Sequence, residues 1–334
     1  MATIRDVAKR ANVSIATVSR VLNNNIKVNE SIRFSVLKAA EELGYPLNQI
    51  RNKPQISPTV LVLTRDETSS LSAQGAGMRE FERRVWDAAH TVLEARGIAT
   101  RLQQSSASHG DAQKYADDVS ISGLILLGGI IDHDFAEALI QREIPFVVAG
   151  SRIAGLAVNA VMGDVAMGIR EATTHLIATG RRKIALINGP TTTMTSLEKL
   201  EGLRLTLALH DRAFDADSVL TADFHPDSGY LQTQRLLDIR PDVDAILYAD
   251  DSIALGGLRA LREQGRRIPE DVALVGFGNY ELAQYTNPLL SSVQFDMALI
   301  GRMAAQRLSM LLDEPDDDAW LMRVPCTFID RQST

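Results

Sequence analysis

The chain of 334 residues has few chemically reactive side chains: one cysteine, six histidines, and aromatic residues at only 5% of its positions. A single cysteine, Cys326, excludes an internal disulfide framework, which is typical of a reducing cytoplasm. We interpret Cys326 as a small buried hydrophobic residue. The histidines show no metal-ligand spacing, and the chain has neither a glycine-rich lysine loop for phosphates nor a Gly-x-Ser-x-Gly motif. We therefore expect a protein that is not an enzyme and that uses no cofactor or metal.

Long apolar segments are absent too. No apolar run is long enough to span a bilayer, and the chain opens without the basic-then-apolar pattern of a secretory signal. These absences predict a cytoplasmic protein with no membrane partner. A chain of this length has room for a small head and two further lobes.

Charge is divided between a basic N-terminal head and an acidic remainder. Residues 1–53 contain nine Lys or Arg against four Asp or Glu, a net charge of +5. The whole chain carries −7, so the remainder carries −12. A basic module joined to an acidic body is typical of a DNA-binding domain attached to a part that does not bind DNA.

The start of the chain predicts two short helices joined by a tight turn. Thr3 can cap the first helix, and Asp6 three residues later completes a short-acid version of a capping box. Residues 11–13 form a compact turn in which Asn12 tolerates a left-handed backbone. Ser14 can then cap a second helix.

The second helix has an apolar stripe at helical spacing, formed by Val18, Val21 and Leu22. Its other face carries small apolar groups, hydroxyls, one guanidinium and one amide, which suit base edges and phosphates. The members of that face are Ile15, Ala16, Thr17, Ser19, Arg20 and Asn23. A third helix over residues 30–43 would close the core with Ile32, Val36, Ala39, Ala40 and Leu43. Helix spacing alone also fits a small subdomain that binds protein, but the basic charge favours DNA.

Residues 3–23 resemble the DNA-binding head of the LacI/GalR family of bacterial transcription repressors, and they match the family pattern at nearly every position. The resemblance returns at residues 164–168, 180–189, 249–269, 275–277 and 331–334. It implies a helix-turn-helix head with a hinge linker over residues 1–58 and an effector-binding, dimerising core over residues 59–334. The residues that we expect on the DNA side are Thr3, Ser14, Ile15, Ala16, Thr17, Ser19, Arg20, Asn23, Lys27, Tyr45 and Asn48.

The expected partners follow from the same resemblance. Two heads on a symmetric homodimer would bind pseudo-palindromic double-stranded operator DNA. The core would bind a small carbohydrate-type effector between its lobes. No leucine-heptad tail follows the core, which favours a dimer over a tetramer.

The body of the chain alternates between apolar strand-like runs and helical stretches. The strand-like runs are residues 59–63, 123–127, 145–149, 183–187, 245–248 and 273–275, and the clearest helices are residues 76–95, 165–178 and 252–264. This alternation predicts an α/β fold with parallel sheets covered on both faces. The family resemblance implies two such lobes, arranged as a periplasmic-binding-protein-like core.

Ligands of parallel sheets bind beyond the carboxyl ends of the strands. That rule and the family positions together predict an effector site composed of Arg65, Asp164, Thr193, Thr195, Lys199, Phe224, Asp250, Gly278 and Phe295. Each has a plainer alternative, since an Asp that follows a strand often caps a helix and Phe224 can simply pack in the core.

Three departures from the family pattern bear on the effector. Lys199 stands where the family usually has Arg, Gly278 where it has Asp, and Asp250 where it has Asn. Losing the acid at 278 while keeping Lys199 and Arg65 favours an anionic ligand, a sugar acid or phosphosugar. Asp250 argues the other way, and the alternative is a neutral sugar, glycoside or nucleoside. A solute-binding or sugar-modifying protein is the alternative from another class.

The linker departs from the family as well. The family has a hinge helix whose leucine wedges into the DNA minor groove, and Pro54 stands at that position. Proline would end a helix there, although it can itself act as a wedge. Ile50 is a second wedge candidate. The alternative is a plain tether stiffened by Pro46, Pro54 and Pro58.

Overall fold

The computed structural model describes residues 3–22, 30–45, 58–65, 80–105, 109–128, 131–315 and 318–334. They belong to two compact units, a head within residues 1–57 and a core within residues 58–334. Among these described residues, no helix combines the length and the apolar character needed to cross a bilayer.

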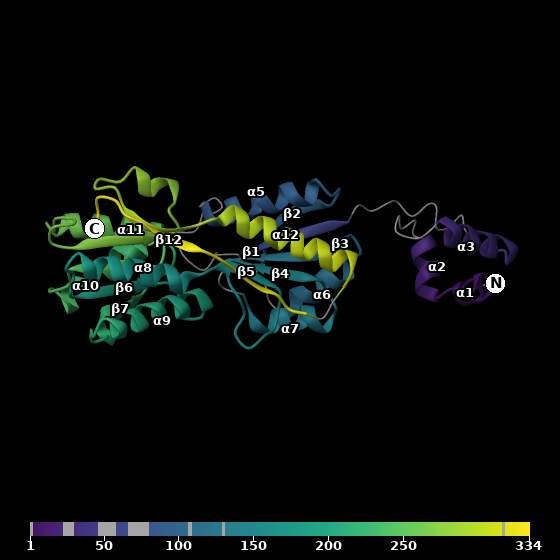
Figure 1. Ribbon diagram of the computed structural model, residues 1–334, viewed down its shortest axis with the longest axis horizontal. Coiled ribbons are helices and arrows are strands. Elements are labelled where there is room, and N and C mark those ends of the chain that lie inside the picture. The colour runs from purple at the N-terminus through teal and green to yellow at the C-terminus, as the bar shows by residue number, and fades with distance from the viewer. Residues whose placement is uncertain are drawn as a thin grey trace. The chain divides into compact units, whose positions relative to one another are not determined.

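Local capping signals start and end the first helices of the head. Its helices are α1 (Ile4–Ala11), α2 (Ile15–Leu22) and α3 (Glu30–Glu42) (Figure 1). The predicted capping box is present, since the Thr3 amide donates to the Asp6 carboxylate over 2.8 Å and the Asp6 amide donates to Thr3 Oγ1. Asn12 has the predicted left-handed backbone, with φ of 55°. The Thr17 amide donates to Ser14 Oγ over 3.0 Å, which confirms the predicted second cap.

A small apolar core holds the three helices together. Val7, Val18 and Val36 are fully buried in it. Ile32 was expected in this core but is 36% exposed, so that prediction is wrong. It lies in the first turn of α3, a helix of 13 residues, whereas α1 and α2 have eight residues each.

The first lobe of the core is a six-stranded sheet in which every neighbouring pair is parallel. Across the sheet the strands run β11 (Leu321–Val324), β5 (Ala160–Gly163), β4 (Phe146–Ala149), β3 (Ile121–Leu127), β1 (Thr59–Arg65) and β2 (Ala99–Ser105). Its helices are α5 (Glu80–Glu94), α6 (His109–Asp117), α7 (His133–Gln141) and α12 (Met297–Asp313). Helices α5 and α12 pack on one face, and α6 and α7 pack on the other.

The second lobe is also a six-stranded sheet covered on both faces (Figure 1). Its strands run β12 (Cys326–Ile329), β10 (Ser291–Phe295), β9 (Ala273–Phe277), β8 (Ala245–Tyr248), β6 (Ile184–Asn188) and β7 (Val219–Thr221). Its helices are α8 (Val165–Ala178), α9 (Met194–Leu209), α10 (Pro226–Ile239) and α11 (Asp251–Glu263), with short turns η1 (Ala216–Ser218) and η2 (Glu281–Gln284). Helices α8 and α9 pack on one face, and α10 and α11 on the other. Strand β12 is antiparallel to β10, whereas the other neighbouring strands of this sheet are parallel as expected. The reason is that β12 enters directly from the other lobe, without the crossover helix that a parallel connection needs.

The chain passes between the lobes three times, at Asp164, Asp296 and Pro325. The segments meet closely, since a Cβ added to Gly163 would lie 3.2 Å from Cys326 Sγ and 3.4 Å from the Phe295 ring. Cys326 is buried at 3% exposure, as the sequence predicts. These crossings make a compact junction between the two lobes.

Candidate functional sites

Three of the hydroxyl groups predicted on the DNA side of the head lie at the starts of helices. The hydroxyl oxygens of Ser14 and Thr17 lie 2.8 Å apart at the start of α2, and Thr3 caps α1. Tyr45 is half buried against the head core. Several predicted positions lie outside the described residues: the side chains of Ile15, Ala16, Ser19 and Arg20, and the whole of Asn23, Lys27, Asn48, Ile50 and Pro54.

The first helix of the head presents its cations to solvent. Arg5, Lys9 and Arg10 are exposed. Arg10 forms an exposed ion pair with Glu42 over 2.5 Å. Exposed cations on a small helical module suit the phosphates of DNA, which supply most of the non-specific binding energy.

Lys199 of α9 lies beneath the carboxyl end of the second sheet. Its Nζ donates to the carbonyl of Ala249 over 2.5 Å and lies 3.9 Å from the centre of the Phe277 ring. The residue is only 6% exposed. Burial lowers the pKa of Lys199 to about 8, although the nearby Asp250 opposes this shift. The ammonium is thus held by a backbone carbonyl and an aromatic face.

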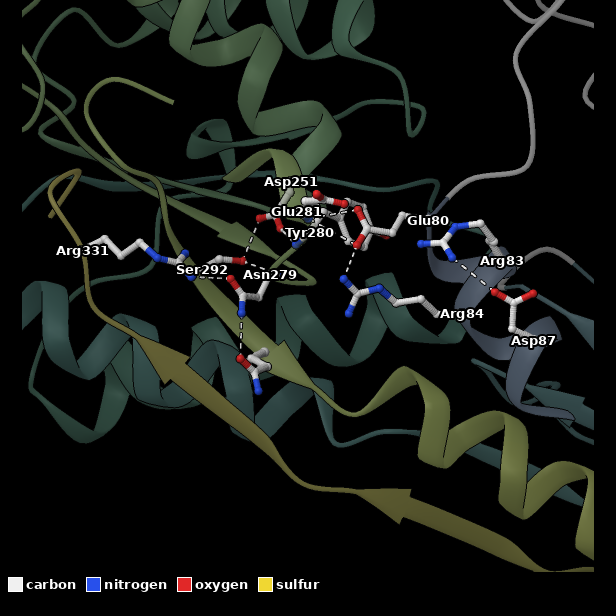
Figure 2. A network of polar contacts seen from close by, with 11 residues as sticks. Glu80, Arg83, Arg84, Asp87, Asp251, Asn279, Tyr280, Glu281, Ser292 and Arg331 are labelled. Carbon is white, nitrogen blue, oxygen red and sulfur yellow. Dashed lines mark hydrogen bonds and ion pairs between the residues drawn. The ribbon is translucent and has the colours of Figure 1, made fainter. Parts of the chain in front are cut away.

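Two adjacent acids follow β8 and lie close to Lys199. Asp250 caps α11: Oδ1 accepts from the Ser252 amide over 2.7 Å, and Oδ2 accepts from the Tyr280 hydroxyl over 2.8 Å. Asp251 accepts from the Ser292 hydroxyl over 2.7 Å and from the Tyr280 amide over 2.6 Å (Figure 2). Burial raises the pKa of Asp251 to about 7 despite these hydrogen bonds. The site therefore contains one carboxyl group that caps a helix, that of Asp250, and one acid, Asp251, that takes up a proton near neutral pH.

Gly278 lies where the chain turns back at the end of β9. Its φ is +119°, and a Cβ there would lie 2.6 Å from Cε1 of Tyr280. The next residue, Asn279, is also left-handed, with φ of 49°. Its side chain donates to Gln294 and accepts from Arg331, which fixes the turn. A side chain at 278 would therefore be strained by the backbone and crowded by the tyrosine ring.

A second group of predicted residues gathers at the end of β6. Thr193 is fully buried and caps α9, accepting from the Ser196 amide, and Thr195 donates to the Thr193 oxygen over 3.3 Å. A Cβ at Gly189 would lie 2.7 Å from Cζ of Phe224 and 2.8 Å from Oγ of Ser196. Phe224 therefore lies against the same turn as the threonine pair.

The remaining predicted residues lie at the lobe junction or in the first lobe. Asp164 caps α8 through the Met167 amide. The Phe295 ring centre lies 5.8 Å from that of Phe277 and so adjoins the Lys199 region. Arg65 is the last residue of β1, and its side chain lies outside the described residues. Asp164 and Asp250 thus both have the capping role that the sequence left open as the plainer alternative.

Polar contacts between the lobes are a feature that sequence reasoning missed. Glu198 of α9 accepts from Arg152 and Arg323 of the first lobe. On α5, the Glu80 carboxylate accepts from the Glu281 amide of the second lobe over 3.0 Å (Figure 2). The only sequence signal for Glu198 is its position directly before Lys199.

In the described part of the chain, His133, Asp134 and Glu137 are close enough together to hold a metal ion. All three are exposed on α7, far in sequence from every predicted site residue. Exposed groups of this kind are common without a metal, and none takes part in the sites described above.

A helix-turn-helix head and a two-lobed α/β core together define a DNA-binding transcription regulator with a ligand-binding core. Residues 3–48 match the family model described as bacterial regulatory proteins, lacI family, and residues 173–334 match a periplasmic binding protein-like domain. The chain is 34% identical over 315 residues to the HTH-type transcriptional regulator CelR of Thermobifida fusca, which covers 92% of this chain and 90% of that protein. The chain therefore belongs to the LacI family of bacterial transcription regulators.

Other relatives and solved structures agree with this family. The ribose operon repressor of Haemophilus influenzae is 28% identical over 338 residues, covering 100% of this chain and 98% of that one. A CelR–cellobiose complex superposes with a TM-score of 0.76 at 31% identity, over 100% of both chains. The lac repressor dimer bound to operator and the anti-inducer ONPF superposes with a TM-score of 0.71 at 25% identity, over 99% of this chain and 98% of that one.

Proposed function

We propose that this protein is a cytoplasmic repressor that binds a pseudo-palindromic operator as a homodimer. The capped helix-turn-helix of the head, with its exposed Arg5 and Lys9, is the observation that carries this proposal. One such head contacts few phosphates and base edges, so two symmetric heads are needed for tight binding. The lac repressor structure, a dimer bound to operator, supports this arrangement.

The effector that the geometry supports best is a neutral, polyhydroxylated sugar or glycoside bound between the lobes. Lys199 already donates to Ala249 and is flanked by two acids, Asp250 and Asp251. An anionic ligand would face those acids, whereas sugar hydroxyls can both donate to carboxylates and accept from neighbouring donors. The relative solved with cellobiose is consistent with such a ligand.

A sugar acid or phosphosugar, the effector class expected from the sequence, is the second candidate. The observation that favours it is Lys199, a buried ammonium at the carboxyl end of the second sheet. In this case the anion would replace the Ala249 carbonyl as the partner of Nζ. A Lys199→Met variant would then lose affinity for the acid and keep its affinity for neutral sugars.

The effector acts by changing the contacts between the lobes. The two lobes share polar contacts at Glu198 and at Glu80, and the chain crosses between them three times. A ligand that closes the lobes shifts these contacts and thereby alters the spacing of the two heads. Coupling of this kind typically amounts to about 1–3 kcal/mol.

Thermal melting against a panel of small molecules tests the effector class. The panel contains cellobiose, ribose, gluconate, glucose 6-phosphate and adenosine, because a ligand that binds only the folded state raises the melting temperature. A shift with neutral sugars alone supports the first candidate, and a shift with gluconate or glucose 6-phosphate alone supports the second. Detectable conversion of any bound sugar would instead support a sugar-modifying enzyme. Fluorescence anisotropy with a selected operator then measures whether the hit changes DNA affinity.

A further inference from the structure

A cavity of about 460 Å³ in the second lobe lies where two strands of its sheet begin. Its lining includes Ile184 and Val219, which are the first residues of β6 and β7. Helix α9 connects this edge of the sheet with the effector region: Lys199 lies in its second turn, whereas Leu207 of its last turn lines the cavity. The cavity is therefore separate from the effector region, which lies where the strands end.

The charged side chains on the cavity wall are mostly cationic. The cations are Arg182, Lys183, Arg212 and Arg240. Two acids, Asp211 and Asp215, line it as well, so four cations against two acids leave an excess of two positive charges. The chain beyond residue 53 carries a net charge of −12, so this concentration of cations runs against the charge of the body. Its charge suits an anion.

The guanidinium groups have donors that the protein does not use. Arg182 and Arg212 are exposed, and within the described residues their side chains form no hydrogen bond or ion pair. Arg240 is held in place, since its Nη1 donates to the carboxylate of Asp215 and, over 3.0 Å, to Oγ of Ser218. Its Nη2 makes no hydrogen bond in the described part of the chain. Arginine forks of this kind match the oxygens of a phosphate.

Much of the remaining lining is apolar. Ile184 and Leu207 are buried side chains, and Phe214 is half buried. The guanidinium of Arg204 lies over the Phe214 ring, 4.6 Å from its centre, which helps to fix the ring. A bare inorganic anion would leave these apolar groups unused, so the lining favours a ligand that joins an anionic group to an apolar body.

We propose that this cavity binds a small organic phosphate, a phosphate monoester with an apolar or ring-shaped body, as a second ligand of the protein. A phosphate monoester carries a charge of about −1.5 to −2 near pH 7, which matches the excess of two positive charges better than the single charge of a carboxylate. The cavity also has the size of a small-molecule site, for which about 300–1,000 Å³ is typical. This site does not depend on the effector that binds between the lobes.

The cations have a second role at this edge of the sheet. Helices α9 and α10 end here, since Leu207 lies in the last turn of α9 and Arg240 is the residue that caps the end of α10. The carboxyl end of a helix attracts positive charge. An experiment must therefore separate ligand binding from this structural role.

Calorimetry on the full chain with phenyl phosphate, in a chloride buffer of fixed ionic strength, makes that separation. Wild type should bind phenyl phosphate several-fold more tightly than inorganic phosphate, which lacks the apolar body. The double variant Arg182→Gln with Arg212→Gln should lower the affinity for phenyl phosphate by roughly 10-fold or more, because it removes charge-assisted hydrogen bonds to the phosphate. Both side chains are exposed, so the variant should keep the fold, and its melting temperature checks this.

Arg235→Gln is the matched control, since Arg235 is an exposed arginine of α10 outside the cavity lining and its loss should leave the affinity unchanged. If wild type binds no phenyl phosphate, or if the double variant binds it as tightly as wild type, the cations serve only the helix ends and the proposal is wrong. Equal affinity for phenyl phosphate and inorganic phosphate would also overturn it. If Lys199→Met abolishes binding while the double variant keeps it, the anion binds in the effector region and not in this cavity.

Discussion

Arg323 of the first lobe donates two hydrogen bonds to the carboxylate of Glu198 in the second lobe, from Nη1 to Oε2 over 2.8 Å and from Nη2 to Oε1 over 3.0 Å. Arg152, also of the first lobe, adds a third bond to the same carboxylate over 2.9 Å. Paired bonds of this geometry are among the stronger polar contacts in proteins. The Glu198 carboxylate thus accepts hydrogen bonds from two arginines of the opposite lobe, beside the junction where effector-driven closure would act.

Replacing Glu198 by Gln should weaken the contact between the lobes. The Glu198 side chain is 12% exposed and that of Arg323 is 36% exposed, so the loss should lie between those of exposed and buried pairs, about 1–3 kcal/mol in the free energy of unfolding. Burial alone would raise the pKa of Glu198, but hydrogen bonds from Arg323 and Arg152 outweigh it and lower that pKa. The stabilisation is therefore present above about pH 4.5, near the usual pKa of Glu, and is lost as the pH falls through the lowered value.

Urea unfolding at neutral and acidic pH measures this effect. Glu263→Gln is the control, because Glu263 pairs with Arg259 on an exposed face of α11 and its loss should cost little. If the two variants lose the same free energy of unfolding at neutral pH, the Glu198 contact between the lobes contributes no more to stability than an exposed ion pair.

Asp251 should make the stability of the core fall as the pH rises. Its pKa is raised to about 7 by burial, so the folded protein binds this proton more tightly than the unfolded chain from about pH 4 to 7. Asp251→Asn removes that proton uptake. As the pH rises from about 4 to 7, the free energy of unfolding of the variant should therefore increase relative to that of wild type. Unfolding midpoints at a series of pH values measure the difference, and parallel profiles for the two proteins would contradict the prediction.

Cys326 should be unreactive in the folded protein. It is 3% exposed at the lobe junction, and burial raises the pKa of its thiol to about 12, so the reactive thiolate is scarce. A thiol reagent such as DTNB should release no colour from native protein and one equivalent after denaturation. Rapid labelling of native protein would show that the junction opens readily, and a sugar that slows such labelling would identify the closing ligand.

Arg20→Ala should weaken the discrimination between bases at one position of the operator. Arg20 lies on α2, the second helix of the helix-turn-helix, and a bidentate contact of arginine with guanine contributes about 1–3 kcal/mol of discrimination. Binding to a set of operators changed one base at a time measures this loss by position. Lys38→Ala, an exposed change on α3, is the control. A uniform loss over all operators would instead make Arg20 a phosphate contact.

The sequence by itself determined the features that depend on neighbouring residues. Thr3 with Asp6, Asn12 and Ser14 specify the ends of α1 and the start of α2, because capping and left-handed turns involve side chains within three residues. Buried strands such as β8 and β9 were predicted from continuous apolar runs, which a sheet covered on both faces requires.

Only the tertiary structure decided which distant residues meet. Tyr280 reaches Asp250 across 30 positions, and Arg323 reaches Glu198 across 125, and no periodicity or spacing in the sequence records these pairs. The orientation of β12 and the exposure of Ile32 were missed for the same reason, since each depends on how distant elements pack in the fold. Local hydrogen bonds are encoded over a few residues, whereas these contacts form only when segments far apart in the sequence pack together in the folded chain.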